Sequence, residues 1–248
     1  MSLIRRASAR RDRRAFAGGP ATPLSIFGAD LRLWLDYKLG VTLGTPPDVA
    51  AWADQSGQAN DAAQGTATDR PDLVAGTGID FDGVSDYLAI PDDASLDFTT
   101  ALTIGLRLRY TNIGGGGVLF AKTPSGGGAW VLQTVTSSVW WRFGALSNYS
   151  ITPVLSAGAW YSLVWVYNGG GAVNADKSRF WINGVEQVQT FNGTIPGTIP
   201  VTADNLYFGR FTDLAVQHFD GDLKAAVCVA KVATAAEVAA LTAYLTGA

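Results

Sequence analysis

Arg179-Phe180-Trp181-Ile182-Asn183-Gly184-Val185-Glu186-Gln187-Val188 is the stretch that decides the fold class. An Asn-Gly pair between two runs rich in β-branched and aromatic residues is a strong signal for a β-hairpin, because both residues accept the positive φ angles of a tight turn. The stretch therefore predicts two antiparallel strands, 179–182 and 185–188, joined by Asn183 and Gly184.

Further strands are expected on both sides of this hairpin. Residues 102–110 alternate between the two faces of a strand, with Arg107 and Arg109 on the polar face. Residues 31–36 alternate in the same way, and residues 160–167 are apolar on nearly both faces, as in a central strand. Strands that recur roughly every 8–15 residues indicate an all-β sandwich or jelly roll.

One helix is expected, at the C-terminal end. Thr234 and Glu237 have the spacing of a capping box, in which each side chain accepts a hydrogen bond from a free N–H of the first turn. Gly247 is suited to terminate the helix, and the residues expected on its apolar face are Val238, Leu241 and Leu245.

The composition excludes several classes of protein and of site. The chain has 248 residues, of which 48% are hydrophobic and 16% charged, so it is not a disordered chain. It contains one cysteine, Cys228, and one histidine, His218, which excludes a disulfide framework and a Cys/His zinc site within one chain. We expect Cys228 in the core and His218 on a strand or rim.

The charge is unevenly distributed. Residues 1–14 contain six arginines and one aspartate, a net charge of +5, whereas the remaining 12 basic and 20 acidic residues give −8. We therefore divide the chain into an arm with a Gly/Pro linker, residues 1–23, and a sandwich, residues 24–248. The arginines of the arm are Arg5, Arg6, Arg10, Arg11, Arg13 and Arg14.

The arm is expected to dock on an acidic surface of a protein partner through Arg–carboxylate pairs. Binding to nucleic acid and packing against a sister subunit are the alternatives, and the acidic body disfavours nucleic acid. The arm lacks the apolar stretch of a secretory signal, and the chain lacks an apolar run long enough to cross a membrane.

Several segments, taken in order, resemble the laminin-G-like branch of the concanavalin A-like lectin/glucanase superfamily. A Trp-x-Asp-x-Ser-Gly turn followed by Asn-Asp spans residues 52–61, and Arg70-Pro71 follows it. Phe81-Asp82-Gly83-Val84-Ser85-Asp86-Tyr87-Leu88 matches a further motif of the branch. The hairpin at 180–184, the strand at 206–209 and residues 219–223 complete the order.

The resemblance implies two curved antiparallel sheets, but it implies no single activity, because the fold hosts lectins, hydrolases, adhesion modules and virion proteins. Together with the basic arm, it resembles bacteriophage head fibre, decoration or tail-associated subunits. We therefore expect a structural or adhesion protein of a virion, and homo-oligomerisation is compatible with this role. The alternative is a stand-alone lectin, extracellular or at a cell surface.

Candidate ligand-binding residues are aromatic. Trp140 and Trp141 are consecutive on an expected strand and must point to opposite faces, so one belongs to the core and the other can stack on a sugar or anchor an interface. Tyr149 lies in the same section. Host-surface glycans are the expected small ligands of this group.

Calcium is the metal considered, because many relatives bind it through oxygen ligands. The available carboxylates are those of Asp54, Asp61, Asp82 and Asp86. We expect instead that Asp54 and Asp82 accept backbone N–H bonds in tight turns, and we expect no cofactor.

Catalysis is not expected. Hydrolases of this superfamily typically carry a Glu-x-Asp-x-Glu pattern, and the chain has only two glutamates, one after the hairpin (Glu186) and one at the helix start (Glu237).

Overall fold

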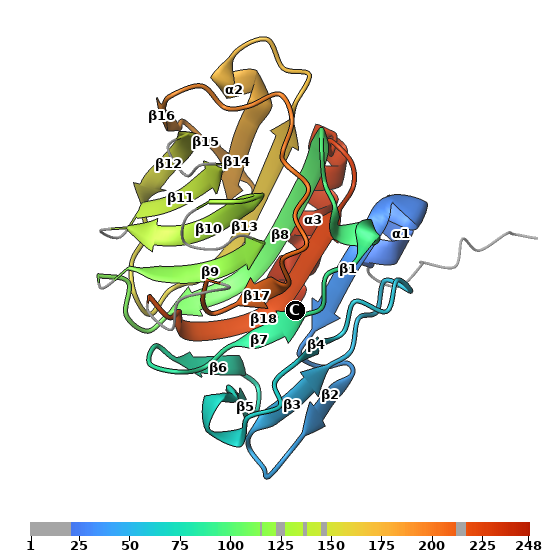
Figure 1. The fold of residues 1–248 in the computed structure, drawn as a ribbon, viewed down its shortest axis with the longest axis vertical. Helices are drawn as coiled ribbons and strands as arrows, with labels where there is room; N and C mark the ends of the chain where they lie inside the picture. Colours follow the sequence, from blue (N-terminus) through green and yellow to red (C-terminus); the bar gives the residue numbers. More distant parts are fainter. Residues whose placement is uncertain (1–20, 115, 123–126, 136–137, 145–147, 212–216) are drawn as a thin grey trace, which may run out of the picture.

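The computed structural model describes residues 21–114, 116–122, 127–135, 138–144, 148–211 and 217–248. These residues form two antiparallel sheets that pack face to face (Figure 1). The all-β sandwich expected from the strand pattern is confirmed, and its architecture is that of a concanavalin A-like jelly roll.

Among the described residues, one sheet has eight strands in the order β15-β14-β13-β8-β18-β6-β5, with β1 also paired to β18. Its strands are β1 Leu31–Asp36, β5 Asp72–Val74, β6 Gly78–Asp82, β8 Ala101–Tyr110, β13 Trp160–Asn168, β14 Ser178–Ile182, β15 Val185–Gln187 and β18 Asp220–Val229.

The second sheet has ten described strands in the order β16-β12-β11-β10-β9-β17-β7-β4-β3-β2. Its strands are β2 Val41–Leu43, β3 Val49–Trp52, β4 Ala62–Ala63, β7 Leu88–Ile90, β9 Gly117–Lys122, β10 Trp130–Val135, β11 Ser138–Phe143, β12 Asn148–Val154, β16 Thr190–Asn192 and β17 Leu206–Phe208.

The predicted hairpin joins β14 and β15. Asn183 and Gly184 have φ angles of 50° and 82°, the positive values that this two-residue turn requires. The strand expected to be central, β13, pairs with β14 on one side and β8 on the other. The side chains that β8 and β13 turn inward meet those of the second sheet in one apolar core.

Two helices cover the outer face of the eight-stranded sheet: α1, Pro23–Phe27, and α3, Ala235–Gly247 (Figure 1). The capping box of α3 is confirmed, since Thr234 and Glu237 accept each other's backbone N–H bonds. A third short helix, α2, spans Asn174–Lys177. Three single-turn 3₁₀ helices span Gly28–Asp30, Ala67–Asp69 and Ala94–Leu96.

Helix α1 stands where the sequence indicated the end of a linker and the start of a strand. Thr22 and Ser25 form a capping box, and Pro23 occupies the first turn, where its missing N–H has no cost. Phe27 at the end of α1 is 5% exposed and packs against β1, β18 and α3. The sandwich that we expected from residue 24 onward therefore begins with a helix and not with a strand.

The loop at 193–200 repeats Gly-Thr-Ile-Pro and forms no strand, which agrees with its two prolines, since proline has no N–H for a ladder bond. Both isoleucines, Ile195 and Ile199, are fully buried in the core between the sheets. The Ile195 carbonyl accepts a bond from Lys177 Nζ at 2.9 Å, and Ile199 N donates to the Thr99 carbonyl at 2.7 Å. The repeat therefore anchors the loop twice.

Lys122, at the end of β9, is a buried cation. Its ammonium contacts the carboxylates of Asp92 and Asp97, the latter at 3.2 Å. It also donates to the carbonyls of Thr202 and Asp204, at 3.3 Å each. A charge at 1% exposure is tolerated because oxygens surround it, and the contacts fasten the segment before β17 to β9.

Candidate functional site

One row of residues crosses the outer face of the ten-stranded sheet. Pairs that lie directly opposite each other share a face, and the pairs are Tyr207–Ala121, Ala121–Val131, Val131–Arg142 and Arg142–Tyr149. Tyr207 and Arg142 are three strand spacings apart, which is roughly 14 Å. The register thus brings distant parts of the sequence to one surface.

An aromatic cluster lies at the β11–β12 end of this row. The rings of Trp140 and Tyr149 are stacked, with centroids 4.4 Å apart and 16° between the planes. The guanidinium of Arg142 lies 4.9 Å from the Trp140 centroid and 5.4 Å from the Tyr149 centroid. Both cation–π contacts hold the guanidinium at a fixed position on the sheet.

A second cluster of the same composition lies at the β17 end. The rings of Tyr87 and Tyr207 have centroids 5.8 Å apart, and Arg210 lies 3.6 Å from the first centroid and 5.2 Å from the second. Phe211 lies between the clusters, where it is 4% exposed and covers Val118, Ala121 and Val131. We call the surface formed by Tyr87, Trp140, Arg142, Tyr149, Tyr207 and Arg210 the aromatic face.

The aromatic face carries the positive charges of Arg142 and Arg210. Among the described residues, neither Arg142 nor Arg210 is in an ion pair. Burial lowers the pKa of Arg142, and only the neighbouring Tyr149 opposes this shift. Half-buried rings offer apolar area for the face of a sugar ring, and arginine donors suit hydroxyl or carboxylate oxygens.

The alternation predicted for the two consecutive tryptophans is confirmed. Trp141 is fully buried and packs against Trp165 and Tyr167, with centroids 6.3 and 6.2 Å away. It therefore belongs to the core and cannot contact a ligand. Trp140 is partly exposed and Tyr149 lies beside it, so the structure brings these two candidates together and separates the third.

Sequence reasoning missed Arg142 and the whole second cluster. Arg142 follows Trp140 by two residues on one strand, so the period of two could have placed it on the same face. Tyr87, Tyr207 and Arg210 gave no comparable signal, because the pairings of β17 with β7 and β9 bring them to this sheet face.

Asp54 is a turn residue whose two oxygens are occupied. Oδ1 accepts from the backbone N–H groups of Trp34 and Ser56, at 2.8 and 2.9 Å. Oδ2 accepts from Ser56 Oγ at 2.6 Å and from the N–H of Asn60 at 3.1 Å. Asp61 in turn accepts from the N–H of Asp54 at 2.8 Å. These contacts close the 54–61 turn against β1.

Asp82 and Asp86 close the next turn in the same manner. Asp82 Oδ1 accepts from the N–H groups of Val84, Ser85 and Asp86 at 2.8–3.1 Å, and Asp86 Oδ2 accepts from Asp82 N at 2.9 Å. Burial acts to raise the pKa of Asp82, but these N–H bonds outweigh it, and the pKa is lowered. Burial raises the pKa of Asp86 to about 7. Both carboxylates thus serve the turn, the role expected for Asp82.

No group of three or more His, Cys, Asp or Glu side chains is arranged to bind a metal within the part of the chain that the structure describes. The two glutamates take part in local contacts. Glu186 forms two 2.7 Å bonds with Arg179 across the hairpin, and Glu237 caps α3 and pairs with Lys231 at 2.6 Å.

Cys228 is fully buried, as expected, and burial raises the pKa of its thiol. His218 is 7% exposed, and its Nδ1 lies 3.4 Å from the carbonyl oxygen of Asp86. His218 forms an isolated bridge with Val118 of β9, so of the two expected positions, strand or rim, it occupies a strand position with a buried side chain.

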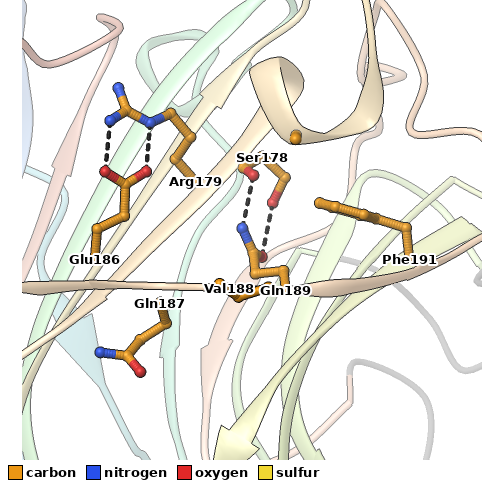
Figure 2. A pocket seen from close by; sticks show the side chains of 8 residues that line it. Ser178, Arg179, Glu186, Gln187, Val188, Gln189 and Phe191 are labelled. Atoms are coloured by element: carbon orange, nitrogen blue, oxygen red, sulfur yellow. Dashed lines mark hydrogen bonds and ion pairs between the residues drawn. The ribbon is translucent and has the colours of Figure 1, made fainter.

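A pocket of about 280 Å³ lies where the β14–β15 hairpin approaches β16 (Figure 2). Gln189 closes one wall by donating to the Ser178 carbonyl at 2.6 Å, and the Arg179–Glu186 pair forms another. The side chain of Phe191 lies at its side. The Arg179–Glu186 and Gln189–Ser178 bonds thus already occupy polar groups on its walls.

The six arginines of the arm, Arg5, Arg6, Arg10, Arg11, Arg13 and Arg14, lie outside the described residues. Within the described part, no helix has the length and apolar character needed to span a bilayer.

The sequence pattern of the concanavalin A-like lectin/glucanases superfamily matches residues 82–239, which is more than half of the chain. The chain belongs to this superfamily. The match covers most of both sheets and all residues of the aromatic face. No curated protein matches the chain.

Solved structures of this superfamily's fold resemble the chain at low sequence identity. The binding domain of Paraclostridial Mosquitocidal Protein 1 has a TM-score of 0.62 and 14% identity, over 87% of this chain and 52% of that one. Cell entry of botulinum neurotoxin type C is dependent upon interaction with two ganglioside molecules. A structure of this toxin has a TM-score of 0.62 and 10% identity, over 87% of this chain and 51% of that one.

A mutant of Trypanosoma rangeli sialidase that displays trans-sialidase activity has a TM-score of 0.62 and 16% identity, over 89% of this chain and 34% of that one. The chain thus spans about half the length of the toxin structures and about a third of the sialidase. At these identities the likeness shows the shared fold.

Proposed function

We propose that this protein is a lectin-like carbohydrate-binding module and that the aromatic face is its glycan-binding surface. The observation that carries the proposal is the stacked Trp140–Tyr149 pair with Arg142 lying against both rings. Large half-buried aromatic side chains beside an arginine are the residues that dominate binding surfaces. Cell entry of botulinum neurotoxin type C is dependent upon two ganglioside molecules, and this supports glycans as the ligand class.

The test uses the complete chain on a glycan array, with each hit quantified by calorimetry. Trp140→Ala and Tyr149→Ala should each weaken the hits by at least about tenfold, since a central aromatic contact contributes on the order of 1–2 kcal/mol. The same array measured in the presence of a calcium chelator tests the alternative that binding depends on calcium. Retained affinity in both variants, or an array without any hit, would refute the proposal.

Arg142→Gln has a matched control in Arg179→Gln. Each arginine lies about 4.8–4.9 Å from a tryptophan centroid, but Arg179 is held by Glu186 and belongs to another sheet. Loss of glycan affinity in Arg142→Gln, with affinity kept in Arg179→Gln, is the expected pattern. Circular dichroism of all variants verifies that the sandwich is folded.

We propose that the module binds glycans without cleaving them. Glu186 and Glu237 each serve a local ion pair, which supports a role in stability. Incubation of the purified chain with each array hit, followed by product analysis, should show no turnover. Release of a reducing end would overturn this part of the proposal.

A more specific proposal concerns where the protein is located. It places the protein on a bacteriophage particle, fastened by the arginines of residues 1–14, and its support is the +5 charge of that segment against the acidic remainder. A chain that lacks residues 1–19 should fail to co-purify with virion proteins while keeping its glycan affinity. Unchanged incorporation would remove the anchoring role, and an extracellular or cell-surface lectin would then be the better assignment.

A further inference from the structure

A separate cluster of charged and aromatic residues lies on the side of the molecule opposite the aromatic face. It is on the outer face of the eight-stranded sheet, beyond the end of α3. Three cations surround the ring of Trp160: Lys224 Nζ at 4.7 Å from its centroid, and the guanidinium carbons of Arg109 and Arg107 at 5.3 and 5.4 Å. We call this group, together with Tyr37 and Lys38, the Trp160 cluster.

Tyr37 extends the cluster toward β1. Its ring lies 5.5 Å from Lys224 Nζ and 5.5 Å from Lys38 Nζ, so Lys224 lies near both rings. Register explains the arrangement: Arg109 is opposite Trp160 on β13, and Arg107 is opposite Ser162. The four cations thus come from two strands, β8 and β18, and the turn after β1, and β13 contributes Trp160.

Few negative charges offset these cations. Arg109 Nε binds Asp222 at 2.8 Å, and this is the one ion pair that the cluster forms with an acidic side chain among the described residues. Lys38 and Lys224 donate to the main-chain oxygens of Gly247 and Ala248, at 3.4 Å each. Arg107 itself forms no ion pair among the described residues.

Arg107 is the least satisfied of the four. Its Nη1 donates to Ser162 Oγ at 3.2 Å, whereas its Nε is buried without a hydrogen-bond partner in the described structure. Burial lowers the pKa of Arg107 and, together with Arg107, Lys38 and Arg109, that of Lys224. Like charges held close at a half-buried position repel one another, and a bound anion would relieve that repulsion.

We propose that the Trp160 cluster binds a sulfate or phosphate group. A tetrahedral oxyanion presents several oxygens in different directions, which suits ammonium and guanidinium donors that converge from β8, β18 and the turn after β1. The site is distinct from the aromatic face and does not rest on glycan binding there. The anion can be free in solution or part of a sulfated saccharide.

Calorimetry of the complete chain with sodium sulfate, sodium phosphate and a sulfated disaccharide tests the proposal, with sodium chloride at equal ionic strength as the blank. We expect saturable binding of at least one oxyanion. Tighter binding of the disaccharide than of free sulfate would assign the sulfated saccharide as the source. No saturable heat with any of the three would overturn the proposal.

Variants place the site. Arg107→Gln and Lys224→Gln should each weaken oxyanion binding by at least tenfold, while Arg32→Gln, which removes a cation bonded to the Ala29 and Leu31 carbonyls, should change it less than twofold. The indole N–H resonance of Trp160, assigned with Trp160→Phe, should shift on titration. An equal effect of Arg32→Gln, or an unshifted resonance at saturation, would show that the anions do not bind here.

Discussion

Asp80 on β6 lies directly opposite Asp222 on β18, and on its other side it lies opposite Asp72 on β5. Like charges at directly opposite positions destabilise a sheet. Burial and the carboxylates of Asp222, Asp220 and Asp72 raise the pKa of Asp80 to about 6, against the opposing effect of Arg109.

This pair predicts a pH-dependent stability. The pKa of Asp80 in the folded state is raised above its unfolded value near 3.8. The stability that protonated Asp80 contributes to the fold is therefore fully present below pH 3.8 and is lost as the pH rises through about 6. Asp80→Asn should therefore stabilise the protein by about 1–2 kcal/mol at pH 8, after allowance for solvent screening, and by almost nothing at pH 3.5. Urea unfolding at both pH values measures this. An equal gain at both would contradict the charge explanation.

Replacement of the buried ammonium of Lys122 should destabilise the fold strongly. Lys122→Met leaves two carboxylates and two carbonyls facing an apolar side chain, for a loss of about 3 kcal/mol in denaturant unfolding. Lys231→Met is the control, because Lys231 is an exposed cation paired with Glu237, and its loss should be much smaller. Similar losses for both would refute the importance of burial.

Two glycines with positive φ angles should differ in their tolerance of alanine. Gly221 has φ +151°, and an added Cβ would lie 2.2 Å from the Arg109 carbonyl oxygen, whereas Gly57 has φ +88° and open space around it. Gly57→Ala should cost about 1 kcal/mol for the backbone alone. Gly221→Ala should cost substantially more, because strands β8 and β18 must separate. Thermal unfolding of the two variants side by side gives the comparison.

The capping box of α3 should contribute measurably to stability. Thr234→Ala removes the acceptor for the N–H of Glu237 and should cost about 1 kcal/mol. Thr234→Ser keeps the hydroxyl and should lose little. If both variants unfold at the same denaturant concentration as the native chain, the cap has no role in the folded state's stability.

Much of the fold could be predicted because local patterns and tertiary packing agree. The Asn183-Gly184 turn, the β13 strand and the α3 capping box each follow from local chemistry that the tertiary structure keeps. Helix α1 was missed because five residues are too few for a periodic pattern, and its stability comes from burying Phe27 against β18 and α3.

The candidate site was predictable only in part. Alternation placed Trp140 and Trp141 on opposite faces, but which of them faces the core depends on how β11 pairs with β10 and β12. Arg210 and Tyr87 join the aromatic face through the β17–β7 and β17–β9 pairings, and pairing between strands distant in sequence is not encoded in any local pattern.

Ala21 and Ala248 line one pocket beside α3, so both ends of the described chain emerge on the helix-covered side of the sandwich, away from the sheet that carries Trp140 (Figure 1). A fluorophore, a purification tag or a second protein module joined after Ala248 would leave the aromatic rings unobstructed. Copies immobilised through Ala248 would all present these rings outward, an orientation that favours simultaneous contact with a surface of repeated ligands.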